Sequence, residues 1–304
     1  LASLDIGRRQ VELEGFELVQ KQIELAMAIR ERIASHPLLS RYFRFLEAKD
    51  MIPSEYRPSG IESYFDPEKG WRNTGMEEAW ATDDFVIDLT RLTLYLGLTG
   101  VDGDTFKNEY LMDKYGIQIN KTSRNTVLFM TNIGTTRSSV AFLIEVLVKI
   151  ATEFEQQRED ASRVELKLLD KRIYSLSKDL PPLPDFSYFH EVFCPGCKQK
   201  VATTDGDIRS AFFHAYDDVN CEYMTIDEDT IGKAMKSGRE LVSASFVTPY
   251  PPGFPVLVPG QVISEQILAF IRALDVKEIH GYNPEIGLQI FTEELLKGIA
   301  EGKA

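Results

Sequence analysis

The chain has 304 residues, of which 43% are hydrophobic and 27% are charged, and its formal net charge is −13 at pH 7. This length can hold two domains and a large core, and the composition is typical of a soluble globular protein. The acidic balance argues against nucleic acid and against a polybasic membrane contact, because both require a basic surface. No apolar run is long enough to span a bilayer.

The cysteines and the first residues indicate the cellular compartment. Three cysteines do not make a disulfide framework, and residues 1–6 lead straight into the charged stretch Gly7-Arg8-Arg9 instead of forming a signal peptide. These features predict a reducing cytoplasm. Because the first residue is not Met and a helical pattern starts at once, we expect the sequence to be part of a longer chain.

The first hundred residues predict one long helix followed by irregular structure. Apolar residues at helical spacing predict a helix over 3–34, with Gly15 as a candidate kink. Prolines and glycines punctuate residues 37–80, which we read as a loop with short elements. The stretch 84–98 is rich in β-forming residues and predicts short strands.

The next segment predicts a compact α+β layer. Thr105 is a plausible N-cap for a helix that ends at Gly116. Residues 117–119 and 126–130 read as strands joined by a turn over 120–125. Ser138 or Ser139 opens a long helix that runs past Ile150 into the charged region 153–171. This order of strand, helix, strand, strand and helix is that of an α+β domain.

The proline-rich stretch Leu180-Pro181-Pro182-Leu183-Pro184 predicts a domain boundary, because these prolines forbid a continuing helix. The predicted domains are therefore 1–180 and 181–304. In the second domain the sequence predicts three helices and two strands, the helices over 207–216, 227–237 and 264–274 and the strands over 241–247 and 286–291.

The stretch Thr248–Gly260 combines prolines and two glycines with Tyr250 and the apolar run Val256-Leu257-Val258. Proline fixes φ and removes an N–H, whereas glycine reaches backbone angles closed to other residues. We expect a stiff bent loop, a short buried strand and a second tight turn. Such rigidity is typical of a wall that holds a ligand.

The residues alone give no catalytic site. The sequence has no Gly-rich phosphate loop, no metalloprotease helix, no nucleophile elbow and no persuasive acid–base constellation. Cys194 and Cys197 have the spacing of a zinc knuckle, but a closed site needs four ligands, and only His190, His214 and Cys221 lie nearby in the sequence. Structural zinc, a redox pair and plain thiols remain open, with plain thiols favoured.

Tyr250-Pro251-Pro252-Gly253-Phe254-Pro255, followed by Pro259-Gly260, resembles the C-terminal domain of the bacterial ornithine/lysine/arginine decarboxylases. These are pyridoxal-phosphate enzymes of the aminotransferase-like (type I) α/β fold. Upstream, Asn120-Lys121-Thr122, Val127-Leu128-Phe129 and Ile133-Gly134 follow the family's order of strand and turn. The resemblance implies that 1–180 is the end of the cofactor-domain region plus the small domain. It makes 181–304 a family-specific α+β C-terminal domain.

The resemblance also implies where catalysis occurs. In the family, the Schiff-base lysine, the aspartate on the pyridine nitrogen and the ring stacked on the cofactor all precede this segment. No lysine here stands in the family's Ser-x-His-Lys setting. We therefore expect no catalytic residue in this chain, pyridoxal phosphate held mainly by residues outside it, and no activity of the chain alone. The implied partners are the N-terminal cofactor domain of the same enzyme and further copies in a homodimer or larger assembly.

Three residues are candidates for contact with the amino-acid substrate. Asn120 stands where the family usually has a glutamate that receives a distal amine, so recognition of an ammonium would be weaker; alternatively it only suits a turn. Arg124 offers a fork for a carboxylate or phosphate, or makes a surface ion pair. Tyr250 closes the site with its hydroxyl or is purely structural. Gln261 replaces an acidic residue common in relatives.

The function implied by the resemblance is decarboxylation of arginine, lysine or ornithine to an amine and carbon dioxide. Two alternatives remain. One is an enzyme of the same fold that acts on another amino acid, which Asn120 favours. The other is a non-catalytic module that binds or regulates a partner decarboxylase.

Overall fold

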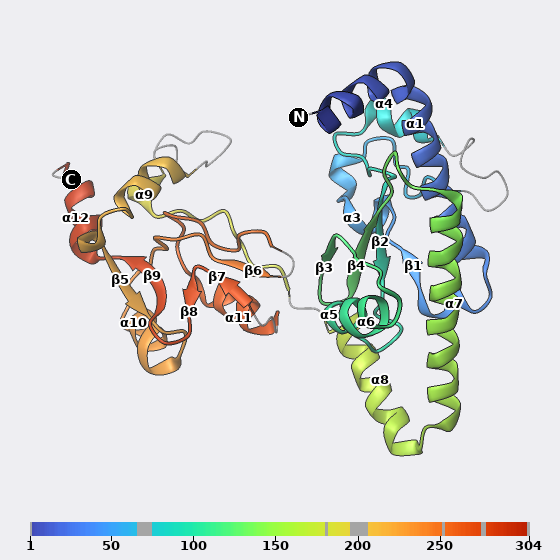
Figure 1. Ribbon diagram of the computed structural model, residues 1–304. Helices are drawn as coiled ribbons and strands as arrows, with labels where there is room; N and C mark the ends of the chain where they lie inside the picture. The colour runs from blue at the N-terminus through green and yellow to red at the C-terminus, as the bar shows by residue number, and fades with distance from the viewer. Residues whose placement is uncertain are drawn as a thin grey trace. The chain divides into compact units, whose positions relative to one another are not determined.

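The structure is a computed structural model that describes residues 2–65, 75–179, 182–194, 206–250, 253–274 and 278–302. The chain divides into two compact units, Leu1–Leu180 and Pro181–Ala304. Both units mix helices with small antiparallel sheets (Figure 1), so the expected α+β class is confirmed. In the described part of the chain, no helix combines the length and apolarity needed to cross a bilayer.

The first unit begins with one long helix, passes through short elements, and ends in a helical hairpin. Its elements in chain order are α1 Ala2–Ser35, α2 Leu39–Tyr42, β1 Arg44–Phe45, α3 Ala48–Met51, η1 Ser54–Tyr56, α4 Met76–Thr82, β2 Arg91–Tyr95, α5 Gly103–Thr105, η3 Phe106–Met112, α6 Asp113–Tyr115, β3 Lys121–Thr122, β4 Thr126–Met130, α7 Arg137–Asp160 and α8 Arg163–Ser177. The predicted first helix and the short elements after it are confirmed, and α1 continues through Gly15.

The sheet of this unit has the strand order β1-β2-β4-β3, and every pair is antiparallel. Alternate residues of β2 and β4 point into the core, among them Leu92, Leu94 and Val127. They pack with the second half of α1 and with α7, which contributes Leu147 and Ile150. Burial of these large apolar side chains is the main stabilising contribution to the unit.

Three predictions in this unit are wrong in detail. The helix expected to begin at Thr105 begins at Gly103, because the carboxylate of Asp102 accepts the N–H of Thr105 as the N-cap. Residues 117–119 are irregular, since Ile117 donates its N–H to Leu111 at the helix end instead of to a strand. The long helix runs past Ile150 as expected, but Thr136 opens it instead of Ser138 or Ser139; it ends at Asp160, and Ser162 forms a capping box with Glu165 that starts α8.

The second unit contains a three-stranded sheet, a two-stranded sheet and helices that pack against them. Its elements are η4 Glu191–Phe193, α9 Ile208–His214, η6 Asp218–Asn220, β5 Cys221–Met224, η7 Glu228–Gly232, α10 Lys233–Lys236, β6 Thr248–Tyr250, α11 Glu265–Ala273, β7 Glu278–His280, β8 Tyr282–Asn283, β9 Gly287–Phe291 and α12 Glu293–Ala300. The strand orders are β5-β9-β8 and β6-β7.

Helix starts in this unit match the sequence well. Asp207, Asp227 and Ser264 each accept an N–H of the first turn, so the three predicted helices are confirmed. The predicted strand over 286–291 is β9. The stretch 241–247 forms only isolated bridges instead of a continuous strand, and the sequence did not predict β5 or α12.

Candidate functional site

The stiff loop predicted after β6 is built around a buried apolar run. Val256 and Leu257 are almost fully buried, and Val247 exchanges backbone hydrogen bonds with this run. Gly260 then turns the chain at a φ of +90°, and a Cβ there would lie 3.1 Å from Cβ of Phe193. Pro251 and Pro252 lie outside the described residues. The loop is thus anchored by its apolar end in the core of the second unit.

Gln261 is a structural residue of this loop. Its side chain is 5% exposed, its carbonyl oxygen accepts the N–H of Val258 at 2.9 Å, and its amide donates to the carbonyl oxygen of Phe186. An amide can accept and donate at once, which a carboxylate cannot do. Gln261 is therefore held by contacts within the second unit.

Tyr250 lies at the end of β6 and is 50% exposed. It pairs with Glu278 across the two-stranded sheet, and its ring meets that of His280 edge to face at 6.2 Å between centroids. The N–H of Gly253 donates to Pro249 at 2.8 Å and brings the chain back over the Tyr250 ring. The ring is therefore held on one side and open on the other.

Arg124 belongs to the hairpin that joins β3 to β4. Ser123 donates its N–H to Thr126, and their hydroxyls also contact each other at 2.6 Å. The Arg124 guanidinium leaves this turn towards the end of α8, where it donates to the hydroxyl of Ser175 at 2.7 Å and to the carbonyl oxygen of Asp179 at 3.3 Å. Both of these hydrogen bonds of the Arg124 guanidinium lie within the first unit.

Asn120 precedes β3 and is exposed, and its backbone N–H donates to Leu128 at 3.1 Å. Its side chain lines a surface pocket of about 530 Å³ between the sheet and α7. Ile29, Leu92 and Phe129 form part of the apolar floor. The polar lining consists of amides and hydroxyls, and none of the described side chains around the pocket carries a charge; the polar members are Gln118, Asn120, Thr131, Asn132, Thr135 and Ser139.

The structure separates the first-unit candidates by role. Asn120 and Arg124 flank the two-residue strand β3, but only Asn120 faces the pocket. Asn132 and Thr135, which lie in the turn before α7, were not singled out from the sequence, and Ser139 was considered only as a possible start of the helix. Some of their polar atoms already make hydrogen bonds in the turn. The N–H of Asn132 donates to the hydroxyl of Thr135, and the N–H of Ser139 donates to the hydroxyl of Thr136, which caps α7. Tyr250 belongs to the second unit.

The described lysines do not fit a Schiff-base role. Such a lysine is desolvated so that its pKa falls, whereas no described lysine is buried. A hydrogen bond from Lys114 to Glu153 raises the pKa of that lysine, and Lys149 and Lys236 are raised in the same way by Glu145 and Glu228.

The sequence candidates for a metal site do not form one among the described residues, where no group of three or more His, Cys, Asp or Glu side chains converges. Cys194 is buried, and Cys197 lies outside the described residues. Nδ1 of His190 accepts the N–H of Val192, which caps η4. The Cys221 thiol contacts the carbonyl oxygen of Ala215, and burial raises its pKa, so it is not a reactive thiolate.

Comparison with known proteins shows that the chain is similar to amino-acid decarboxylases. Residues 216–292 match the family model described as the C-terminal domain of Orn/Lys/Arg decarboxylases. The chain is 24% identical over 304 residues to an arginine decarboxylase of Bacillus subtilis, covering 100% of this chain and 46% of that protein. It is 24% identical over 311 residues to the constitutive ornithine decarboxylase of Escherichia coli, covering 94% of this chain and 42% of that protein.

The fold is similar to that of a solved decarboxylase as well. The lysine decarboxylase of Francisella novicida matches with a TM-score of 0.52 and 19% identity, covering 91% of this chain and 40% of that chain. The resemblance found in the loop at Tyr250 is therefore confirmed. The chain spans about half the length of the curated relatives it matches.

Proposed function

We propose that this chain, which is related to the C-terminal part of the bacterial ornithine/lysine/arginine decarboxylases, is the C-terminal portion of a pyridoxal-phosphate-dependent amino-acid decarboxylase. The observation that carries this proposal is the match to the decarboxylase C-terminal domain over 216–292, together with similarity to arginine decarboxylase along the whole chain. The reaction would convert an amino acid to an amine and carbon dioxide.

The chain's own contribution is a wall of the substrate site. Pyridoxal phosphate, when bound to the rest of the enzyme, supplies the electron sink that makes loss of the carboxylate possible. Asn120 would orient the distal part of the substrate by hydrogen bonds, and the apolar floor of its pocket would exclude water from that part. Tyr250, whose ring is open on one side, is a separate candidate on the second unit for contact with the substrate. Residues 1–180 would supply the small domain and 181–304 the C-terminal domain.

The 304-residue chain alone is expected to be inactive. Its described lysines are exposed or half-exposed, and those with a shifted pKa hold their protons more tightly. A Schiff-base lysine requires the opposite environment. The cofactor and its lysine would lie in the preceding half of the protein, and the working enzyme would be a homodimer or larger.

A second candidate substrate class is favoured by the pocket at Asn120. Arginine, lysine and ornithine end in a cation, and burying a cation without an anionic partner is costly. The described lining of this pocket contains amides, hydroxyls and apolar groups but no carboxylate. An amino acid with an uncharged side chain would therefore be bound here with less loss of solvation than a basic one.

The proposal is tested on the longer protein that contains this sequence. Intact-mass analysis and the cofactor absorbance spectrum would show whether the longer chain carries bound pyridoxal phosphate, and an amine-release assay would compare basic with uncharged amino acids. We expect bound cofactor and amine formation with the longer chain, and neither with the 304-residue chain. If the protein is complete at 304 residues, binds no cofactor and gains no activity with any partner, the decarboxylase proposal is refuted. The remaining interpretation is then the non-catalytic module that regulates a partner decarboxylase.

A further inference from the structure

The first half of α1 carries large apolar side chains that the described residues of the first unit leave exposed. The exposed side chains include Leu13, at 68%, and Phe16, at 83%; the others are Leu4, Ile6, Val11 and Val19. Burial begins only at Leu25 and continues through Ile29 and Ile33. A helix half that remained solvent-exposed on all sides would carry polar residues at most of these positions.

The exposed side chains lie on two stripes of α1, one of which reaches a buried residue and the other a half-buried residue further along the same helix. Leu4, Val11 and Leu18 are spaced by seven residues, which is two helical turns, and the next position in this series is the buried Leu25. The same spacing places Ile6 and Leu13 on a second stripe, which passes through the exposed polar residue Gln20 before it reaches the half-buried Met27. Met27 packs against the small core at α3 and α4.

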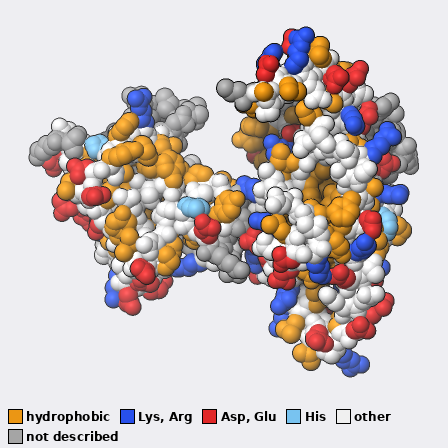
Figure 2. Space-filling model, viewed as in Figure 1, with side chains coloured by type: hydrophobic (Ala, Val, Ile, Leu, Met, Phe, Trp, Pro, Cys, Tyr) orange, Lys and Arg blue, Asp and Glu red, His pale blue; other side chains and the backbone are white. Residues whose placement is uncertain are grey.

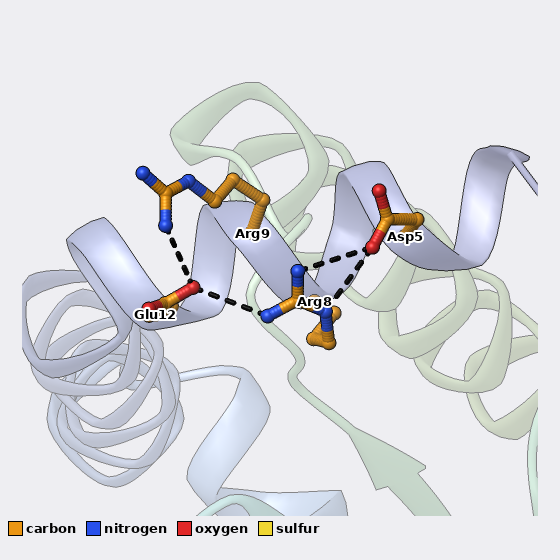
Figure 3. A network of polar contacts seen from close by, with 4 residues as sticks. All are labelled: Asp5, Arg8, Arg9 and Glu12. Atoms are coloured by element: carbon orange, nitrogen blue, oxygen red, sulfur yellow. Dashed lines mark hydrogen bonds and ion pairs between the residues drawn. The ribbon is translucent and has the colours of Figure 1, made fainter.

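The polar side chains between these stripes satisfy one another. Arg8 pairs with Asp5 at 3.1 Å and with Glu12 at 3.2 Å, and Arg9 pairs with the same oxygen of Glu12 at 3.0 Å (Figure 3). All four side chains are more than half exposed. The network leaves no uncompensated charge on this face. Figure 2 shows hydrophobic side chains close to this end of α1. The surface therefore suits an apolar partner.

We propose that residues 4–19 of α1 are a docking surface for the preceding half of the same protein, covered on both apolar stripes in the whole enzyme. This inference rests on the proposed function. The relatives extend for more than half of their length beyond the part matched by this chain, and the match is to their C-terminal part. The preceding half would be joined to the first turn of α1, which gives it a high effective concentration at this surface.

A second copy of the 304-residue chain is a weaker occupant. Each copy carries a formal net charge of −13, which opposes association through one helix. The two stripes lie on different sides of the helix, so a covering partner has to embrace it. A tethered domain can do this without the entropic cost of bringing together two free molecules.

The test compares the same substitutions in the 304-residue chain and in the longer protein. In the longer protein, Leu13→Ser with Phe16→Ser should lower the melting temperature by at least about 5 °C, because two buried apolar side chains are lost. In the 304-residue chain the shift should be small, since both side chains are already exposed. The matched control is Gln10→Ser with Glu14→Ser, which changes two exposed polar positions of the same helix half and should behave alike in both proteins.

Hydrogen exchange gives an independent readout. Amides of residues 4–19 should exchange at least about 100-fold more slowly in the longer protein than in the 304-residue chain. Equal exchange and equal melting shifts in the two proteins would overturn the proposal. A 304-residue dimer that Leu13→Ser with Phe16→Ser dissolves would also overturn it, in favour of a second copy. If the longer protein binds the cofactor but the amides of α1 are not protected, only the docking-surface proposal is refuted. If the amides of α1 are protected but no cofactor is bound, only the decarboxylase proposal is refuted.

Discussion

The guanidinium of Arg124 donates a 2.7 Å hydrogen bond to the hydroxyl of Ser175 and so ties the β3–β4 hairpin to the last turn of α8. The neighbouring Asn125 donates to the carbonyl oxygen of Leu176 at 2.8 Å. The last carbonyl groups of a helix lack partners within the helix and carry the negative end of its dipole. Asn125 thus caps one of the last carbonyl groups of α8, and Arg124 ties the hairpin to the same end of the helix through the Ser175 hydroxyl and the carbonyl oxygen of Asp179.

Arg124→Ala should therefore destabilise the first unit by about 1–2 kcal/mol through the loss of two charge-assisted hydrogen bonds. Chemical denaturation of the 304-residue chain measures this change. Arg124→Lys keeps the charge without the fork and should recover only part of the loss. An unchanged free energy of unfolding in the 304-residue chain, combined with a large fall in kcat/KM of the longer enzyme, would instead make Arg124 a substrate ligand.

Asn120→Glu should shift the longer enzyme towards lysine or ornithine. The substitution places a carboxylate at the edge of a pocket whose described lining has no charge, and a carboxylate can pair with a distal ammonium. We expect at least a tenfold rise in kcat/KM for these substrates relative to uncharged amino acids, about 1.4 kcal/mol. Asn120→Gln, which keeps the neutral amide, is the control. Equal preferences in all three proteins would remove Asn120 from the site.

Gly103→Ala should be strongly destabilising because the start of α5 packs directly on the hairpin. A Cβ at Gly103 would lie 2.1 Å from the carbonyl oxygen of Ser123 and 2.7 Å from that of Thr126, and neither backbone atom can move away cheaply. We expect a loss of about 1–3 kcal/mol or more in the free energy of unfolding.

Gly7→Ala is the matched control for Gly103→Ala. Gly7 lies in α1 with no atom near its missing Cβ, and alanine favours helix, so stability should be unchanged or rise by up to about 1 kcal/mol. Thermal unfolding of both variants measures the contrast. Similar melting temperatures for the two would show that the hairpin does not touch α5.

Tyr42 should ionise at unusually high pH. Burial and the hydrogen bond that its hydroxyl donates to Glu155 raise the pKa of Tyr42 to about 12, well above the ordinary value for a tyrosine. A group whose pKa is raised by folding adds stability below its unfolded pKa and loses it as pH rises through the folded value. Tyr42→Phe should therefore be less stable than the wild type at pH 8, and the deficit should vanish as pH approaches about 12.

The same pair has an acid limb. The hydrogen bond from Tyr42, followed by Arg41, lowers the pKa of Glu155, so its contribution is lost as pH falls through that lowered value. Ultraviolet difference titration of wild type against Tyr42→Phe isolates one tyrosine among 12. Tyr216→Phe, at an exposed ring, serves as the control for stability. If the difference between the two titrations shows that the tyrosine removed in Tyr42→Phe ionises near pH 10, the contact with Glu155 is contradicted.

Features fixed by neighbouring residues were predictable from the sequence. Asp207, Asp227 and Ser264 cap the helices predicted for them, and Gly116 ends its helix at a φ of +65°. The alternating apolar residues of β4 were also enough to predict that strand. The break between α7 and α8 was missed, although Ser162 and Glu165 form a recognisable capping box there.

Features fixed by distant residues were not predictable. Ile117-Gln118-Ile119 alternates like a strand, but the pairing partner of β4 is the polar pair Lys121-Thr122. The contacts of Arg124 lie 51 and 55 residues away in sequence, so no local pattern separates a helix cap from a substrate ligand. Asn120 was found through the family resemblance, whereas the uncharged lining of its pocket required the fold.

The strand order of the second unit has a consequence for biosynthesis. Its three-stranded sheet is centred on β9, Gly287–Phe291, which pairs with β5 on one side and β8 on the other. The sheet of the first unit, by contrast, has all its strands by Met130. During translation the first sheet can form while the rest of the chain is being made, but the second sheet has to wait for nearly the last residues. Ribosomes stalled within α11 should therefore expose a second unit without its central strand, which is a target for chaperones.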